Sequence, residues 1–503
     1  MKKTSLHFQS AEQFLELSNH FRLGHLMTEQ GHDFTKGLDV LCKNEPGQAF
    51  HRIRQVDIEA IGKYLTELRS CQEGLNNLVS RSEGNVYLGG CGATGRLSML
   101  AEFLSKAVVE TPQEIRGFTA GGDVALVHAL EGFEDQMDFG ARQLTELGYQ
   151  PRDTFFGITE GGETPFVIGA THEAAEHQQG PVAFLYCNPT QVLTETIERS
   201  KQIIDHPHVR STCLATSPMA LAGSTRMQAT SIQLLSCLES LFGVTADQIK
   251  KLVEVYQSLD EASFGELVAA EADVYQSGGH VHYCVAPEFA LSVFTDTTER
   301  APTFSLSSFE PKSETSRSSL CYISVMGTKD PLQAWQSILG RAPRPLDWEG
   351  IDPRAGSTYL TGFDFSEHAI SWRQAKTKGE NHLFEISREN GVIELKFQNR
   401  IWKLPKTENP LLDQVLLKLV LNNHSTSLMG RMGRFKSHFM TFVKPSNGKL
   451  IDRVVRYTRQ LLEEQGQRVE YDQVVHRLFE VKDQLKLDEP IVLRLYESFR
   501  SEA

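Results

Sequence analysis

Short apolar runs alternate with helix-like patterns through the first half of the chain. The runs fall at residues 86–89, 115–120, 154–158 and 182–186, and each is followed by apolar residues at helical spacing. Buried strands separated by helices are typical of right-handed βαβ units, which build a parallel sheet covered on both faces. The pattern predicts an α/β fold, preceded by helices between residues 11 and 80.

The second half carries a less regular version of this pattern. Strand-like runs return at residues 281–285, 320–325 and 392–397, and the chain is mostly helical from residue 411 to its end. The first of these strands ends at Ala286-Pro287-Glu288, without a glycine. We therefore expect a second α/β unit that lacks a phosphate-binding loop.

A glycine-rich turn follows the first strand. Gly90, Gly92 and Gly95 satisfy the pattern G-x-G-x-x-G and lead directly into a helical stretch. Glycine lets the backbone approach an anion closely, free N–H groups at a helix N-terminus attract it, and the Thr94 hydroxyl is a further donor. The turn therefore predicts a phosphate site. The alternatives are a dinucleotide, with Asp123 holding its ribose, and a tight turn without a ligand.

A second loop rich in glycine and hydroxyl groups, residues 159–165, follows the third strand. Ligands of open parallel sheets bind beyond the carboxyl ends of the strands, so two such loops favour a phosphate and a sugar ring. Glu160 and Glu163 would repel a phosphate, and we expect them to contact sugar hydroxyls or solvent. A further acidic group is either part of the site or a solvated helix face: Glu131, Glu134 and Asp135.

Composition narrows the class of protein. The chain has 503 residues and a net charge of −13, which argues against a nucleic-acid partner. It shows no signal-peptide core and no apolar run that would span a membrane. The eight cysteines form no C-x-x-C pair and predict free thiols in a reducing compartment. We expect a cytoplasmic protein without a metal or a cofactor.

Six motifs stand in order along the first half, at residues 90–97, 120–123, 131–135, 164–169, 187–189 and 223–227. Together they resemble the sugar isomerase (SIS) domain, in the branch shared by N-acetylmuramic acid 6-phosphate etherases and the glucokinase regulatory protein. The etherases have one SIS domain and dimerise, whereas the regulatory protein has two in one chain. The layout here resembles the second arrangement more closely.

The resemblance implies two tandem SIS domains, each a flavodoxin-like parallel sheet flanked by helices, that form a pseudo-dimer within the chain. The expected parts are an N-terminal helical segment (1–70), a sugar-phosphate-binding SIS domain (71–250), a degenerate SIS domain (251–440) and a lid-like helical region (441–503).

The resemblance also places the contacts to the phosphate and the sugar. They fall on Gly92, Ala93, Thr94, Thr159, Gly161 and Glu163. Three positions depart from the family's usual residues: Ala93 replaces a threonine, Glu163 a serine or arginine, and Gln228 a lysine. These changes affect the expected specificity for a sugar phosphate.

Further matches lie in both halves. Glu134 matches one catalytic glutamate of the etherases. The second catalytic glutamate has no counterpart in the first domain, where Leu104 stands, but it matches Glu299 in the second domain. The two halves would then share one complete site. Arg434 follows Gly433 where the regulatory protein has a ligand-contacting lysine, and it keeps the charge while adding a planar fork.

Three functions follow from this resemblance. The first is a sensor that binds a sugar phosphate, with a sugar kinase as its protein partner. The second is an etherase-type carbon–oxygen lyase, in which two carboxylates of different pKa act as base and acid on an amino-sugar 6-phosphate. The third is an aldose–ketose isomerase of phosphosugars. The residues alone leave turnover open.

Overall fold

The first sheet is fully parallel. The computed structural model describes residues 8–109, 113–130, 132–176, 179–486 and 488–501. The strand order is β2-β1-β3-β4-β5, the flavodoxin-like order. The strands are β1 (Val86–Gly90), β2 (Ile115–Thr119), β3 (Thr154–Ile158), β4 (Val182–Tyr186) and β5 (Arg210–Cys213). The pattern predicted β1 to β4 but not β5, because the residues of β5 are mostly polar and only one of them is buried.

Helices cover this sheet as the βαβ pattern predicts. Helix α5 (Gly92–Ala107) packs on β1 and β2 and contacts α10 (Gln228–Phe242), which also touches α4 (Arg69–Val79). Helix α7 (Pro165–Glu176) packs on β3 and β4 and lies beside α6 (Met137–Glu146). The strand order reverses direction between β1 and β3, so the loops after these two strands flank the crevice where such sheets bind ligands.

The second sheet is mixed, with strand order β10-β9-β8-β6-β7. Strands β6 (His280–Val285), β7 (Cys321–Val325) and β8 (Asn381–Glu389) are parallel, whereas β9 (Val392–Phe397) and β10 (Arg400–Leu404) continue the sheet antiparallel. The expected mixture of α and β structure with two sheets is confirmed, but the second sheet is not parallel throughout. Tight two-residue turns cause the difference: Asn390-Gly391 and Gln398-Asn399 all have positive φ, as hairpin turns require.

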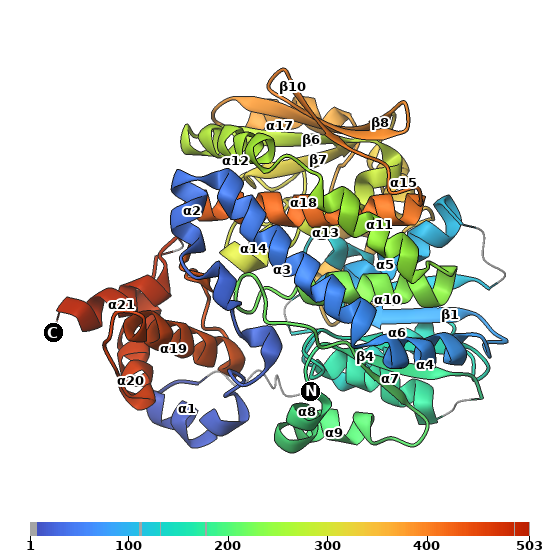
Figure 1. Cartoon of the computed structure of the whole chain (residues 1–503), viewed down its shortest axis with the longest axis horizontal. Coiled ribbons are helices and arrows are strands. Elements are labelled where there is room, and N and C mark those ends of the chain that lie inside the picture. Colours follow the sequence, from blue (N-terminus) through green and yellow to red (C-terminus); the bar gives the residue numbers. More distant parts are fainter. Residues whose placement is uncertain (1–7, 110–112, 131, 177–178, 487, 502–503) are drawn as a thin grey trace.

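A helical layer separates the two sheets (Figure 1). Its centre is α18 (Pro410–Arg431), whose residues are buried from Leu411 to Gly430. A helix that is buried all round must pack on every side. Helix α18 indeed contacts α2 (Leu38–Asn44), α3 (Pro46–Thr66), α10, α11 (Ala246–Gln257), α12 (Glu261–Gln276) and α13 (Ala290–Thr297). The two halves therefore share one continuous core.

Both ends of the described chain are helical. Helices α19 (Gly448–Glu463), α20 (Tyr471–Val481) and α21 (Ile491–Ser501) pack together, with α1 (Ala11–Leu17) against α20 (Figure 1). The carboxylate of Glu29 is paired with Arg453 at 2.6 Å and Arg456 at 2.9 Å. These ion pairs attach the N-terminal segment to α19.

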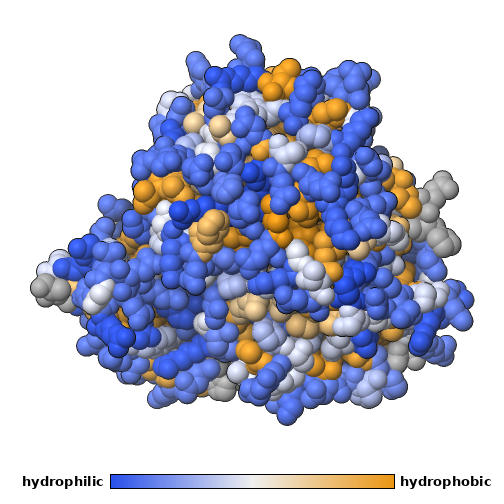
Figure 2. All heavy atoms as spheres, in the orientation of Figure 1, coloured by the Kyte–Doolittle hydropathy of each residue, from blue (hydrophilic) through white to orange (hydrophobic). Residues whose placement is uncertain are grey.

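The molecular face in Figure 2 is mainly hydrophilic, with hydrophobic residues in small separate groups. Within the described ranges, no helix is both long enough and apolar enough to cross a membrane.

Candidate functional site

The turn between β1 and α5 presents backbone donors at the carboxyl end of the first sheet. Gly92 has φ +51° and is exposed, and Ala93 is partly exposed. No hydrogen bond is recorded to the N–H groups of these two residues in the described part of the chain. They are the first residues of α5, where unpaired N–H groups and the helix dipole favour an anion.

The hydroxyl of Thr94 does not point to this opening. It donates to the Cys91 carbonyl at 2.9 Å and accepts from the Cys91 N–H at 3.1 Å, and the residue is 1% exposed. These bonds cap α5. In this structure the helix cap uses the hydroxyl that the sequence assigns to a phosphate, and the phosphate contact stays a prediction.

Glu299, from the second half, lies against the same turn. A Cβ atom at Gly92 would stand 3.6 Å from Glu299 Oε1. The Glu299 carboxylate is ion-paired with the guanidinium of Arg96 in α5. The same guanidinium donates hydrogen bonds to the carbonyls of Leu126 and Ala125. Both halves of the chain thus contribute to the surroundings of the glycine turn.

Glu134 lies close enough to Glu299 for their charges to interact. Glu134 is an exposed residue. Its pKa is raised, first by partial desolvation and then by the carboxylates of Asp135, Glu163 and Glu299, while Lys449 opposes the shift. Glu131, of the same acidic motif, lies outside the described residues.

The loop after β3 holds Glu163 in two ion pairs. Arg199 Nη2 is 2.6 Å from its Oε2 and Lys449 Nζ is 2.7 Å from its Oε1. Burial alone would raise the pKa of Glu163, but Lys449 and Arg199 together hold it at about 2. Because Lys449 belongs to α19, this carboxylate ties the C-terminal helices to the loop instead of facing solvent.

The two other predicted contacts in this loop are occupied by protein. The hydroxyls of Thr159 and Thr164 are 2.9 Å apart, and the carbonyl of Gly161 accepts a hydrogen bond from Asn188 Nδ2 at 2.9 Å. Thr159 is 1% exposed, whereas Gly161 is partly exposed. Of these two, only Gly161 has surface that a ligand could reach.

Glu160, which the sequence places against sugar hydroxyls or solvent, accepts hydrogen bonds from hydroxyls of the protein. Burial, followed by the Glu299 carboxylate, raises its pKa to about 7. The hydroxyls of Thr225 and Thr230 donate to its Oε1, each at 3.3 Å. The signal in the sequence was the carboxylate in a glycine loop, but its hydroxyl partners lie about seventy residues further along the chain.

The motif at residues 223–227 supports the interior beneath the site. Arg226 is ion-paired with Asp296 at 2.6 Å and donates to the hydroxyls of Ser425 and Thr426, both at 3.0 Å. Gln228, at the family's lysine position, donates to Asp57 Oδ1 at 2.6 Å. This motif therefore joins α10 to the central helices.

Two predicted residues have other partners. Asp123, the acid of the dinucleotide alternative, is ion-paired with Arg341 at 2.5 Å and accepts from the Arg344 N–H at 2.6 Å. Asp123 therefore has no free carboxylate oxygen pair for a ribose, which removes the support for a dinucleotide. Arg434 pairs with Asp488 at 3.4 Å and lies over the ring of Phe442, 4.7 Å from its centroid. Within the described ranges, no contact joins Arg434 to the glycine turn.

In the part of the chain that the structure describes, no three histidine, cysteine or carboxylate side chains are placed to hold a metal ion.

Known proteins are similar to parts of this chain. Residues 69–175 match the family model of the glucokinase regulatory protein N-terminal SIS domain. An N-acetylmuramic acid 6-phosphate etherase of Synechococcus elongatus is 30% identical over 207 residues, which cover 41% of this chain and 63% of that protein. The corresponding protein of Gloeothece citriformis is 33% identical over the same shares. The chain thus spans less than two thirds of the length of these relatives.

A solved structure with a similar fold is tagatose-6-phosphate ketose/aldose isomerase from Escherichia coli. It has a TM-score of 0.43 and 10% identity, and the match covers 78% of this chain and 95% of that chain. The parallel sheet, its glycine turn and the family match over residues 69–175 lead to one assignment: this part of the chain is an SIS domain.

Proposed function

We propose that the chain binds a sugar phosphate at the carboxyl ends of β1 and β3. The N–H groups of Gly92 and Ala93 would hold the phosphate, and the sugar would face Glu134, Glu160 and Glu299. One observation carries the proposal: Glu299 of the second half lies beside the unpaired N–H groups of the first-half turn. The relatives named N-acetylmuramic acid 6-phosphate etherase act on a phosphorylated sugar, which supports the ligand class.

A sensing role suits the links around this site. Glu163 joins the β3 loop to Lys449 of α19, and Arg96 joins the glycine turn to Glu299. A ligand that moves Glu163 would also move the C-terminal helices through Lys449. A ligand that moves Glu299 would change the contact between the glycine turn and the second half. The regulatory-protein resemblance adds a sugar kinase as the partner to test, by comparing co-purification with and without the sugar phosphate.

A lyase of the etherase type is the second candidate, favoured by the carboxylates Glu134 and Glu299 around one turn. In this reaction one carboxylate removes the proton from C2 of the open-chain sugar. The other protonates the ether oxygen as its bond to C3 breaks, lactate leaves, and water adds across the new double bond. The raised pKa of Glu134 fits the proton donor of such a pair.

Titration calorimetry with hexose, hexosamine and muramic acid 6-phosphates tests the proposal. We expect one site per chain, because the turn after β6 is Ala286-Pro287-Glu288, which has no glycine and whose Glu288 is paired with Arg388. Inorganic phosphate and the unphosphorylated sugars are the controls. No binding by any sugar phosphate, or two equivalent sites, would contradict the proposal.

Lactate release from N-acetylmuramic acid 6-phosphate separates the two candidates. For a lyase, Glu134→Gln and Glu299→Gln should each lower the rate by about 10²–10⁴-fold while substrate still binds. For a sensor, the unmodified protein should release no lactate and exchange no C2 proton in D₂O, and both variants should change affinity alone.

A further inference from the structure

An irregular segment of the second half lies across the first half and reaches the residue next to Glu134. It comprises residues 340–352, between α15 (Pro331–Leu339) and the short helix that begins at Pro353. Segments of this length without a helix or strand are uncommon in compact domains and are often functional. We name residues 340–352 the strap.

The strap begins with ion pairs to the first half. The Arg341 guanidinium is 3.0 Å from Glu102 and 2.5 Å from Asp123. The Arg344 N–H donates to Asp123 at 2.6 Å, and the Arg344 guanidinium pairs with Glu102. Glu102 is 1% exposed and Asp123 is 4% exposed. Because a buried carboxylate that loses its partner is costly, these pairs hold the strap over α5 and the turn that follows β2.

Trp348 inserts into the first half. Within the strap, which the structure describes throughout, Trp348 alone is buried, whereas its neighbours Asp347 and Glu349 are exposed. Its indole Nε1 donates to Glu146 of α6 at 2.7 Å, and the Arg142 guanidinium lies 4.4 Å from the centre of its ring. A buried indole N–H needs such a partner, so this hydrogen bond helps to fix the ring in one orientation.

The ring of Trp348 packs on Phe133, the residue that precedes Glu134. The two ring centres are 6.0 Å apart and the planes differ by 23°, and Phe139 of α6 packs edge-on against both rings. Phe133 is 3% exposed, whereas Glu134 and Asp135 after it are exposed. Phe133 is therefore the side chain that anchors this part of the loop, and Trp348 provides part of the surface beneath it.

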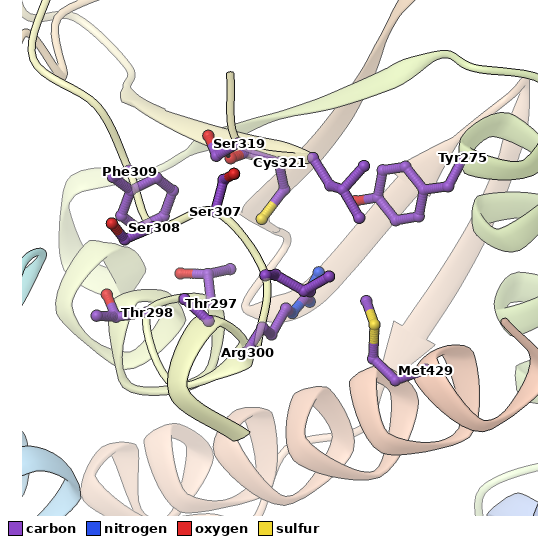
Figure 3. A pocket seen from close by; sticks show the side chains of 13 residues that line it. Tyr275, Thr297, Thr298, Arg300, Ser307, Ser308, Phe309, Ser319, Cys321 and Met429 are labelled. Carbon is purple, nitrogen blue, oxygen red and sulfur yellow. Dashed lines mark hydrogen bonds between the residues drawn. The ribbon is translucent and has the colours of Figure 1, made fainter. Parts of the chain in front are cut away.

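The other carboxylate beside the glycine turn, Glu299, is held by the second half directly. It immediately precedes α14 (Arg300–Phe304), and its two neighbours in the chain line a small cavity inside the second half, together with Cys321 and Met429 (Figure 3). Glu134, by contrast, belongs to the first half and is linked to the second half through the strap.

We propose that Trp348 is a positioning residue, which acts through Phe133 to fix the Glu134 carboxylate relative to the glycine turn. The inference rests on the proposed function, in which Glu134 faces the sugar. The second half, which has no glycine turn of its own after β6, then places both Glu134 and Glu299 around the site of the first half.

Titration calorimetry with the sugar phosphate that binds best tests this role. Trp348→Leu removes the stacked ring, and sugar-phosphate affinity should fall about tenfold, the effect of losing one hydrogen bond to a charged group. Adding Glu134→Gln to this variant should cause little further loss, because the carboxylate is already displaced. Inorganic phosphate needs only the N–H groups of the turn and should bind equally to Trp348→Leu and the unmodified protein.

Two further variants separate positioning from general stability. Trp348→Phe keeps an aromatic ring against Phe133 and should retain affinity close to that of the unmodified protein. Trp402→Leu removes another buried indole, whose Nε1 donates to the Ser263 carbonyl at 2.7 Å, and it should lower stability without changing affinity. If Trp348→Leu does not fold, Phe133→Leu replaces it, because that change removes the same stack from the other side.

Hydrogen exchange measures the positioning without a ligand. The Phe166 N–H donates to the Glu134 carbonyl at 3.0 Å, so peptides that cover residues 132–136 and Phe166 should exchange faster in Trp348→Leu. Unchanged exchange there would overturn the positioning role even if no sugar phosphate binds. Losses of affinity that simply multiply in the double variant would overturn the link from Trp348 through Glu134 to the sugar. Failure of every sugar phosphate to bind the unmodified protein would contradict the proposed function instead.

Discussion

The carboxylate of Glu299 and the guanidinium of Arg96 form a nearly buried ion pair between the two halves of the chain. The Arg96 side chain is 2% exposed and that of Glu299 is 12% exposed. Arg96 stands in the first turns of α5, and Glu299 stands between α13 and α14. The pair thus fixes the second half against the glycine turn of the first.

Breaking this pair should destabilise the protein. Arg96→Met leaves Glu299 without its counter-ion in a mostly buried place, and we expect a loss of about 3–5 kcal/mol in the free energy of unfolding. The matched control is Arg400→Met, which removes a pair with Glu266 whose side chains are 59% and 61% exposed. That change should cost less than about 1 kcal/mol. Denaturant titration measures both, and equal losses would contradict the role assigned to Arg96.

Thr94→Val tests whether this hydroxyl serves the helix cap or the ligand. The valine keeps the shape but removes both bonds to Cys91, so stability should fall by about 1 kcal/mol. Sugar-phosphate affinity should change less than twofold, because the hydroxyl faces away from the exposed N–H groups. A large loss of affinity at unchanged stability would show that the hydroxyl contacts the phosphate.

Gly92→Ala tests the backbone donors. Gly92 has φ +51°, so any side chain costs about 1–2 kcal/mol, and the new methyl group would stand beside Glu299 in front of the N–H groups. Gly278→Ala is the control, since Gly278 also has positive φ (+82°) but nothing lies within 4 Å of its added Cβ. Both variants should lose similar stability, whereas calorimetry should show weaker sugar-phosphate binding in Gly92→Ala alone.

Glu160 and Glu163 should make stability depend on pH in opposite directions. The pKa of Glu160 is raised from 4.5 to about 7, so the folded state binds its proton more tightly than the unfolded state does. Its contribution is greatest below about pH 4.5 and is lost as pH rises to about 7. The pKa of Glu163 is lowered to about 2, so its contribution is present above 4.5 and lost as pH falls towards 2.

Denaturant titration across this pH range provides the measurement. Glu160→Gln should reduce the fall in stability between about pH 4.5 and 7, and Asp57→Asn should reduce it further, since burial raises the pKa of Asp57 to about 7 as well. Glu163→Gln should lower stability above about pH 4.5 and should remove the loss of stability between about pH 4.5 and 2. A pH profile that Glu160→Gln leaves unchanged would contradict the assignment of that carboxyl.

Local pattern was sufficient for the elements that build the first sheet. Strands β1 to β4 are buried along nearly all of their length, so each appears in the sequence as an apolar run. The turn needs a glycine because the backbone packs closely there: a Cβ at Gly90 would lie 2.4 Å from the Thr94 carbonyl carbon. Strand β5 was not predicted because it is polar. The run at residues 392–397 predicted β9, but not its antiparallel hairpin with β10, because that pairing depends on the turn between them.

The α/β character of the chain and its glycine turn follow from the order of the residues, and the family resemblance adds the residues around which we expect a site. The partners of each polar group follow from the three-dimensional packing alone. Glu163 lies 286 residues from Lys449, and Asp123 lies 218 residues from Arg341, yet each pair is in hydrogen-bond contact. The strength of an ion pair depends on distance and burial in space, and neither is encoded in the local spacing of residues.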